Sequence, residues 1–375
     1  MITGIICEYN PLHLGHKKQL DLIRKADPEG SIVCLMSGNY VQRGKPAIVD
    51  KSLRAEAAIR AGADLVLEMP VGGSLSSAEG FANEGVRILG KLCDILCFGA
   101  ETAEKESIFT TAKALLSPEF SEILVRYMDE GQSYPAACQA ALEELNVSGE
   151  LLRRPNDILA VEYCKAILKQ NAPLDIFPIC REGDYHDRLP DRENPSATAV
   201  RELMLLGGPW QDYVPFVPEG ELHTLEQGEK AILARLRTMT DEEFESLPHG
   251  SEGLWRKLMH AARSGATLEE ILEEVKSKRY PRTRLDRMVM CAFLGLTAED
   301  IKMPAPYVRV LAFNDKGRQI LRDSKERITL VNAGENVDSP YQEIETRCGR
   351  LYGLFAQNPE HPEIEKERRV RYISK

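Results

Sequence analysis

The sequence predicts an α/β protein in which a doubly wound parallel sheet of the Rossmann-like kind is followed by a mainly α-helical domain. Five short runs rich in Ile, Val, Leu and Cys punctuate the first half, and segments of helical period separate them. Such alternation is typical of right-handed β-α-β crossovers. From about residue 212 helical patterns dominate instead. For 375 residues we expect two domains, a catalytic one over 1–212 and a mainly helical one over 213–375.

Each apolar run is predicted to be a strand buried on both faces, as in a parallel sheet. The five runs lie at 2–7, 31–36, 63–69, 93–98 and 174–180. Amphipathic helices are expected at 16–25, 51–61 and 77–92, with several more between 103 and 170. Because ligands of such sheets bind outside the carboxyl ends of the strands, the segments just after the runs are where we expect the chemistry.

The second half carries four further helical patterns, at 226–239, 251–264, 268–276 and 284–294. One apolar run at 307–313 is compatible with a strand. The charged stretch 363–371 is expected to be a solvated tail.

Composition excludes several classes of protein. No apolar run approaches the roughly 18 residues of a membrane span, and the first residues lack the basic region of a signal peptide, so we expect a cytoplasmic protein. A net charge of −10 argues against indiscriminate binding to nucleic acid. Among nine cysteines, Cys7, Cys34, Cys97 and Cys180 fall in apolar runs and are expected to pack as small hydrophobes. The spacing of Cys93 and Cys97 indicates packing far more often than a zinc half-site.

The segment after the first strand has the composition of a phosphate-binding loop. His13 and His16 stand three residues apart with Gly15 between them, and a helix begins there. Backbone N–H groups at a helix start attract phosphate, and two imidazoles on one face of the first turn can donate to the same phosphate oxygens. Such donors would stabilise charge that develops at an α-phosphate during displacement. Ordinary histidines at a helix start, or a zinc site made by both histidines and Cys7, are the alternatives.

A second phosphate element is predicted at 196–201. The hydroxyls of Ser196 and Thr198 and the early N–H groups of a helix suit phosphate oxygens, and Arg201 suits a departing pyrophosphate. The alternative is a helix N-cap followed by a surface arginine.

These two elements resemble the His-x-Gly-His signature and the Ser/Thr-rich signature of nucleotidyltransferases related to class I aminoacyl-tRNA synthetases. The runs at 37–51, 54–56, 62–70, 98–101, 154–159 and 279–285 are, more closely, similar to the bacterial tRNA(Met) cytidine acetate ligase family. The resemblance covers most of the chain and is weakest at about 205–250. It implies a two-step reaction, in which ATP and acetate give acetyladenylate and the acetyl group then passes to N4 of the wobble cytidine of elongator tRNA(Met).

The resemblance also implies an ATP site. Carried over by position, it comprises Cys7, Glu8, Tyr9, Asn10, Pro11, Leu12, His13, Leu14, Gly15, His16, Lys17, Lys18, Gln19, Leu20, Gly99, Asn156 and Arg181. Gly99 would admit the adenosine, although a tight turn explains it equally. Asn156 would bind the adenine edge or the ribose, or else cap the following helix. Arg181 ends the fifth strand, where a surface salt bridge is the alternative.

Acetate must approach the α-phosphate against charge repulsion, which calls for nearby donors or cations. Asn39, Gln42 and Arg43 follow the second strand and are expected to supply them. Mg²⁺ bridging the phosphates is expected as well, with no protein ligand assigned.

An RNA-binding patch is predicted at 276–287, where six cations face a single acid, a net charge of +5. The expected tRNA contacts are Lys276, Lys278, Arg279, Arg282, Arg284 and Arg287, with Tyr280 available for stacking. A solvated helix end is the alternative.

Two other functions compete with the ligase. One is a small-molecule nucleotidyltransferase of the pantothenate synthetase or nicotinate-mononucleotide adenylyltransferase kind, which needs no basic partner domain. The other is a catalytically silent RNA-binding protein, against which both phosphate signatures retain their chemical groups.

Overall fold

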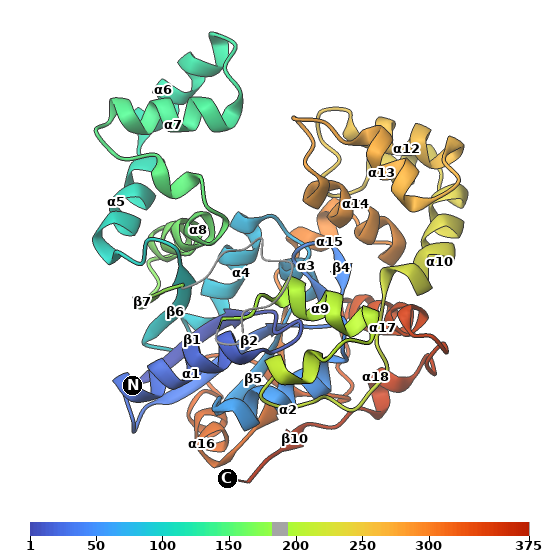
Figure 1. Cartoon of the computed structure of the whole chain (residues 1–375). Coiled ribbons are helices and arrows are strands. Elements are labelled where there is room, and N and C mark those ends of the chain that lie inside the picture. Colours follow the sequence, from blue (N-terminus) through green and yellow to red (C-terminus); the bar gives the residue numbers. More distant parts are fainter. Residues whose placement is uncertain (182–193, 375) are drawn as a thin grey trace.

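The computed structural model describes residues 1–181 and 194–374. One sheet organises the chain, with strand order β10-β8-β5-β2-β1-β6-β7 and β9 paired to β8 (Figure 1). Its strands are β1 (Ile2–Cys7), β2 (Ser31–Ser37), β5 (Leu65–Met69), β6 (Ile95–Ala100), β7 (Asp175–Cys180), β8 (Val308–Phe313), β9 (Leu330–Asn332) and β10 (Arg371–Tyr372). A separate hairpin joins β3 (Tyr40–Val41) and β4 (Lys45–Pro46).

The five predicted strands are confirmed as β1, β2, β5, β6 and β7, which lie side by side and parallel. Their carboxyl ends therefore meet at one edge of the sheet. Helices cover both faces, as expected of a doubly wound sheet. Leu20 of α1 (Leu14–Ala26) and Ala58 of α2 (Lys51–Ala61) pack on one face, whereas Phe81 of α4 (Ala78–Leu89) and Ala160 of α8 (Pro155–Gln170) pack on the other.

The helices of the first half are α1 (Leu14–Ala26), α2 (Lys51–Ala61), α3 (Val71–Ser74), α4 (Ala78–Leu89), α5 (Lys105–Leu115), α6 (Pro118–Asp129), α7 (Tyr134–Glu144), α8 (Pro155–Gln170) and α9 (Ala197–Leu206). Those of the second half are α10 (Leu225–Thr238), α11 (Asp241–Glu245), α12 (Leu254–Ser264), α13 (Leu268–Val275), α14 (Arg282–Leu294), α15 (Ala298–Lys302), α16 (Asp315–Asp323), α17 (Pro340–Tyr352) and α18 (Ile364–Glu367). Short 3₁₀ turns occur at Glu150–Leu152, Trp210–Tyr213 and Gly353–Phe355. Among the described residues, no helix combines the length and apolarity that a membrane span requires.

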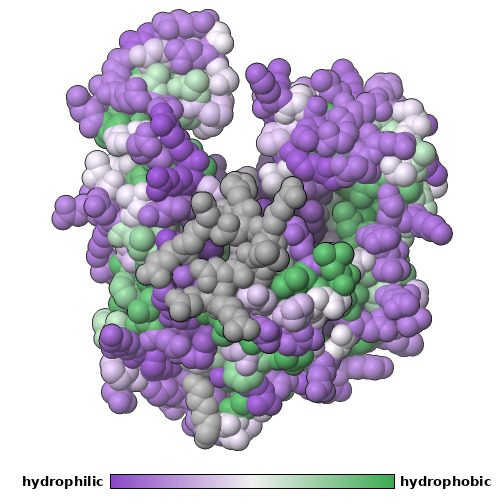
Figure 2. Space-filling view, in the orientation of Figure 1, coloured by the Kyte–Doolittle hydropathy of each residue, from purple (hydrophilic) through white to green (hydrophobic). Residues whose placement is uncertain are grey.

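The second half forms a helical lobe and then returns to the sheet. Helices α10 to α14 share a core with α17, and Tyr40 and Leu75 from the first half join that core. In Figure 1 this lobe and the α6–α7 hairpin stand on either side of the sheet's upper edge, and Figure 2 shows a hollow between their largely hydrophilic surfaces. Strand β8 is antiparallel to β5, a departure from the all-parallel sheet that we predicted. A boundary at 212/213 thus leaves three strands of the sheet in the second half.

The charged stretch at 363–371 is not a solvated tail, and this expectation was wrong. Arg368 is buried and forms ion pairs with Asp50 and Glu365, and Glu365 in turn contacts Lys51. Two side chains of opposite sign in the stretch, Glu365 and Arg368, thus find buried partners at the start of α2. The exposed thiol of Cys180 is a second correction, because β7 forms the edge of the sheet and is only partly covered.

Candidate active site

A cavity of about 540 Å³ opens at the carboxyl edge of the sheet, beside the ends of β1 and β6. Most of the predicted site residues line it: Cys7, Glu8, Tyr9, Asn10, His13, His16, Gln19, Gln42, Arg43, Gly99, Asn156, Arg181, Ser196, Thr198 and Arg201. Leu12 and Leu20 instead pack in the core beneath the loop. Lys17 forms an ion pair with Asp21, and Lys18 is exposed. Pro11, Leu14 and Gly15 shape the turn between β1 and α1.

The two histidines form a stacked pair at the start of α1. Their ring centroids lie 3.7 Å apart with an interplanar angle of 24°, and the Tyr9 ring lies 5.0 Å from that of His16. The backbone N–H of His13 donates to Nδ1 of His16 over 3.3 Å, which leaves the proton of a neutral His16 on Nε2. Gly15 makes this stack possible, because a Cβ there would lie 3.1 Å from Cε1 of His13.

Both imidazoles are held neutral. Burial, and then the nearby charges of Arg181 and Arg201, lower the pKa of His13 from 6.5 to about 3. Burial, together with His13 and Arg181, also lowers the pKa of His16 well below 6.5. The buried Nδ1 of His13 makes no hydrogen bond within the described part of the chain. The site thus offers neutral N–H donors and two guanidinium groups to one small region, which suits a polyanion.

Arg54 joins the loops around this cavity, and no local sequence pattern indicates that role. It is buried on α2 and donates to the carbonyl oxygens of Glu8 (2.6 Å), Ser37 (3.0 Å), Val49 (2.8 Å) and Gly38. The ends of β1 and β2 and the start of α2 are therefore joined by one side chain. Because Arg54 donates to backbone carbonyl oxygens, no particular partner residue in the sequence indicates its role.

The opposite wall is built by Gly99, Asn156 and Arg181. A Cβ at Gly99 would lie 3.1 Å from Cγ of Arg181, so the glycine gives room to the arginine. Nη1 of Arg181 donates to Oδ1 of Asn156 over 3.4 Å, and Nδ2 of Asn156 donates to Oε1 of Glu101 over 2.7 Å. Glu101 also accepts from the backbone N–H of Asp157. Glu101, which is not among the predicted site residues, orients Asn156 at the start of α8.

The second predicted element forms the start of α9. Ser196 is the N-cap and accepts from the N–H of Ala199 over 3.1 Å, as the alternative for that residue required. Arg201 is not a surface arginine. Its guanidinium donates to the carbonyl oxygen of Asn10 over 2.7 Å and to Oγ1 of Thr198 over 3.1 Å. This contact brings the two predicted phosphate elements together across 191 positions of sequence.

The three residues predicted to bind acetate do not line the same cavity. Gln42 and Arg43 line the large cavity, and the N–H of Gln42 donates to Oε1 of Glu8 over 2.8 Å. Asn39 lines a different cavity of about 30 Å³, beside Lys51 and Glu68, and so lies apart from the other two. The chain turns after β2, and the β3–β4 hairpin carries only Gln42 and Arg43 into the large cavity.

Metal sites are not formed by the described residues, among which no group of three or more His, Cys, Asp or Glu side chains converges. Cys7 is buried, its Sγ lies 3.8 Å from the carbonyl oxygen of Leu35, and burial raises its pKa well above the ordinary value. A thiol in that state is a poor zinc ligand. Among the described residues that line the cavity, Glu8 and Glu202 carry carboxylates, and a phosphate-bound Mg²⁺ takes most of its ligands from phosphates and water.

The predicted RNA patch is only partly available. Arg282 pairs with Glu269 (2.6 Å) and Asp286 (2.9 Å), and Lys276 pairs with Glu273 (2.9 Å). Arg287 is buried, with 9% of its surface exposed, and donates to the carbonyl oxygen of Gln42. Tyr280, at 3% exposure, is closed to base stacking. Acidic residues of α13 neutralise part of this positive charge. They lie outside the segment 276–287, over which the charge was counted.

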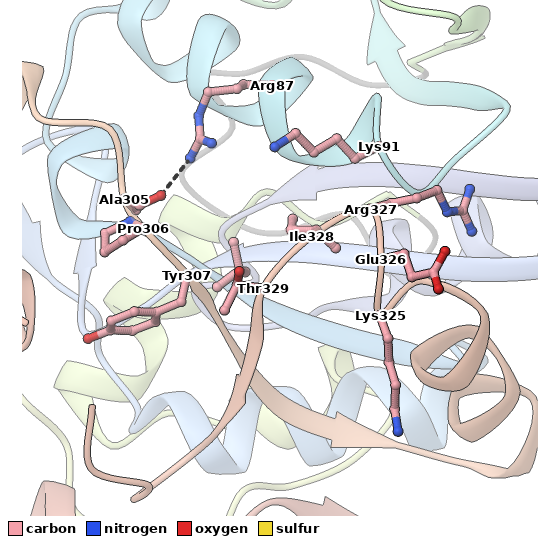
Figure 3. Close-up of a pocket in the computed structure, with 11 residues that line it drawn as sticks. Arg87, Lys91, Ala305, Pro306, Tyr307, Lys325, Glu326, Arg327, Ile328 and Thr329 are labelled. Atoms are coloured by element: carbon pink, nitrogen blue, oxygen red, sulfur yellow. Dashed lines mark hydrogen bonds between the residues drawn. The ribbon is translucent and has the colours of Figure 1, made fainter. Parts of the chain in front are cut away.

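Another pocket, of about 200 Å³, lies between the end of α4 and the loops that flank β8 and β9 (Figure 3). Arg87 points from α4 toward this loop and donates to the carbonyl oxygen of Ala305 over 3.4 Å. Arg87 also pairs with Glu84. None of the residues predicted for ATP, acetate or tRNA lines this pocket, so it is separate from the candidate active site.

The fold and the site together define a nucleotidyltransferase whose phosphate loop follows the first strand. The family described as HIGH Nucleotidyl Transferase matches residues 1–367. Within it, the chain belongs to the tRNA(Met) cytidine acetate ligase family. The ligase of Clostridium novyi is 36% identical over 357 residues, 88% of each chain, and that of Clostridium tetani is 36% identical over 385 residues, 94% of this chain and 95% of the relative.

Solved structures agree with this assignment. Thermotoga maritima TmcAL in its apo form superposes with a TM-score of 0.89 at 26% identity, and all of both chains is covered. The same protein bound with alpha-thio ATP superposes with a TM-score of 0.87 at 27% identity, again over both whole chains. That relative therefore binds an ATP analogue.

Proposed function

We propose that this protein is an AMP-forming, ATP-dependent acetate ligase that acts on tRNA. It makes acetyladenylate from acetate and ATP and transfers the acetyl group to N4 of the wobble cytidine of elongator tRNA(Met), giving N4-acetylcytidine. The observation that carries the proposal is the convergence of the neutral His13–His16 pair with Arg181 and Arg201 in one cavity. The names of the relatives supply the substrate class.

In the first step, a carboxylate oxygen of acetate attacks the α-phosphorus of ATP. A new P–O bond forms, the bond to the β-phosphate oxygen breaks, and pyrophosphate leaves with its electron pair. Charge grows on the α-phosphoryl oxygens and the leaving group, where N–H donors already in place stabilise it. His13 and His16 are assigned to the α-phosphate, and Arg201 to the departing pyrophosphate. The neutral histidines act here as hydrogen-bond donors, and the displacement itself requires no proton transfer.

Gln42 and Arg43 are assigned to acetate. Both line the cavity on the β3–β4 hairpin, and Glu8 fixes the backbone of Gln42. A guanidinium and an amide can bind a small carboxylate and offset its repulsion from the triphosphate. On the far wall, Phe98, Leu159 and Tyr163 line the cavity beside Asn156 and suit a purine ring. When bound, Mg²⁺ would neutralise phosphate charge, with Glu8 and Glu202 as the protein carboxylates in reach.

In the second step, N4 of cytidine attacks the carbonyl carbon of acetyladenylate. A C–N bond forms, the C–O bond to AMP breaks, and the N4 proton is lost. AMP is therefore a product, together with the pyrophosphate of the first step.

Labelled acetate tests the proposal. With ATP, the pure protein should place the label in cytidine of elongator tRNA(Met), with AMP and pyrophosphate as co-products and no need for coenzyme A, as measured by nucleoside mass spectrometry. Label that enters only from acetyl-coenzyme A, or ADP and phosphate as products, would refute the mechanism. Acetate-independent transfer of AMP to a small molecule would favour the small-molecule nucleotidyltransferase instead.

A further inference from the structure

We infer that the phosphate backbone of RNA binds at a basic corner of the helical lobe, where Lys257 of α12, Arg279 and Arg284 lie around the ring of Tyr280. Arg256 and Lys278, their neighbours in the chain, complete this corner. This inference rests on the proposed function, which makes tRNA the substrate. It replaces the linear patch at 276–287 with a surface that sequence order does not reveal.

The corner gathers cations at one point. Lys257 Nζ lies 5.3 Å from the centroid of the Tyr280 ring, Arg284 Cζ lies 5.4 Å from it, and Arg279 Cζ lies 5.8 Å from it. Arg256, exposed on the same turn of α12, lies over the Trp255 ring with Cζ 4.9 Å from its centroid. Like charges this close repel one another, and a single aromatic face offsets only part of that cost.

Little negative charge balances these groups. Glu252 pairs with Arg279 over 3.0 Å and reaches Arg284 at 4.0 Å, and this carboxylate is itself half exposed. Helix α12 holds three cations and no acidic residue in Leu254–Ser264. A polyanion would relieve the repulsion, and guanidinium groups match phosphate oxygens in geometry.

The neighbouring surfaces limit where the polyanion can lie. Helix α13 packs against α12 and carries four exposed glutamates, at 269, 270, 273 and 274. At the far end of α12, Arg263 is paired with Asp241. Negative charge therefore borders the corner on these sides, and Lys276 and Arg282 lie on the neutralised side.

The corner adjoins the active-site cavity. Arg284 and Arg287 stand three residues apart on α14, which is about one helical turn. Arg287 donates to the carbonyl oxygen of Gln42, and Gln42 lines the cavity. Gly44 of the same hairpin sits so close to α14 that a Cβ there would lie 2.3 Å from the backbone N of Arg287. An RNA strand held at the corner is thus positioned beside the wall assigned to acetate.

Two double variants separate the corner from the linear patch. Arg256→Gln with Lys257→Gln removes two exposed cations of the corner, and Lys276→Gln with Arg282→Gln removes the same charge from the neutralised side. Binding of full-length elongator tRNA(Met) would be measured by fluorescence anisotropy over a range of KCl concentrations. Thermal unfolding and tRNA-free, acetate-dependent release of pyrophosphate serve as checks on folding and on the ATP site.

If both cations of the corner contact phosphates, the first variant should lower the slope of log K against log salt by about 1.4 to 1.8, because each contact releases roughly 0.7 to 0.9 counterion. At about 0.15 M salt this corresponds to binding that is roughly 15- to 30-fold weaker. The second variant should bind within about threefold of wild type, and both should still release pyrophosphate.

Wild-type affinity and slope in the first variant, with tRNA acetylation intact, would overturn the inference and leave the proposed function standing. Weaker binding in the second variant alone would also overturn it and return the site to the linear patch. A wild-type protein that acetylates no tRNA would overturn the function itself, an outcome that differs from either of these.

Discussion

The depressed pKa of His13 makes the stability of the ligand-free protein depend on pH in a way that can be calculated. Burial lowers its pKa from 6.5 to about 3. At pH 5 the unfolded chain therefore binds a proton at this position and the folded chain does not. Above about pH 6.5 His13 is neutral in both states and costs no stability. As the pH falls toward about 3, the protein loses stability, because the unfolded chain binds a proton that the folded chain does not.

The size of the effect follows from the two pKa values. Between pH 7 and pH 5, protonation of His13 in the unfolded chain lowers the free energy of unfolding by about 2 kcal/mol. In His13→Gln this proton is absent, so the variant should lose about 2 kcal/mol less than wild type over the same interval, whatever its stability at pH 7. His361→Gln, at an exposed position, is the matched control.

Urea denaturation at pH 7 and pH 5, without ATP, measures the difference. Equal losses in wild type and His13→Gln would show that His13 is not kept neutral by the fold. The depressed pKa from which the role of His13 as an uncharged donor is argued would then be wrong, because the fold would leave that pKa near its ordinary value.

Three further variants test the site. His16→Ala should lower acetate-dependent pyrophosphate release by at least ~100-fold, the effect of losing one transition-state donor, and unchanged release in a folded variant would contradict the phosphate assignment. Arg201→Lys keeps the charge but cannot span both Asn10 and Thr198, so the KM for ATP should rise about tenfold or more in steady-state assays, and a KM equal to that of wild type would remove Arg201 from the site. Arg54→Met leaves four carbonyl oxygens without their donor and should cost roughly 3 kcal/mol in urea denaturation, whereas Arg60→Met on the same helix should cost under about 1 kcal/mol; similar losses would refute the buried role of Arg54.

Buried apolar periodicity made the central sheet predictable. The run at 2–7 coincides with β1, and the other four parallel strands differ from their predicted bounds by only one or two residues at either end. Strands β9 and β10 have three and two residues, and β10 begins with Arg371. Strands this short carry no periodic signal, and both pair with β8.

Residues whose side chains suit a phosphate ligand were easier to select from the sequence than residues that bind other residues. His13, His16 and Arg201 carry chemistry that phosphate requires, and all three line one cavity. Arg54 and Glu101 serve backbone groups and another side chain, over distances in sequence that no local pattern reports. The net charge of the basic stretch 276–287 was overestimated for the same reason, since Glu269 and Glu252 pair with its arginines from outside the segment.

The position of α18 and β10 bears on how the protein is made. Asp50 and Lys51, at the start of the helix that follows the acetate-side hairpin, take their buried partners from Glu365 and Arg368. During synthesis these partners are translated more than 300 positions after the groups they neutralise. A nascent chain that has not yet released them keeps Lys51 paired with Glu68 but leaves Asp50 without its arginine, and burying Asp50 in that state is unfavourable. We therefore expect chains that stop before residue 364 to remain open at this edge and to leave ATP unconsumed, so that release from the ribosome and the onset of activity coincide.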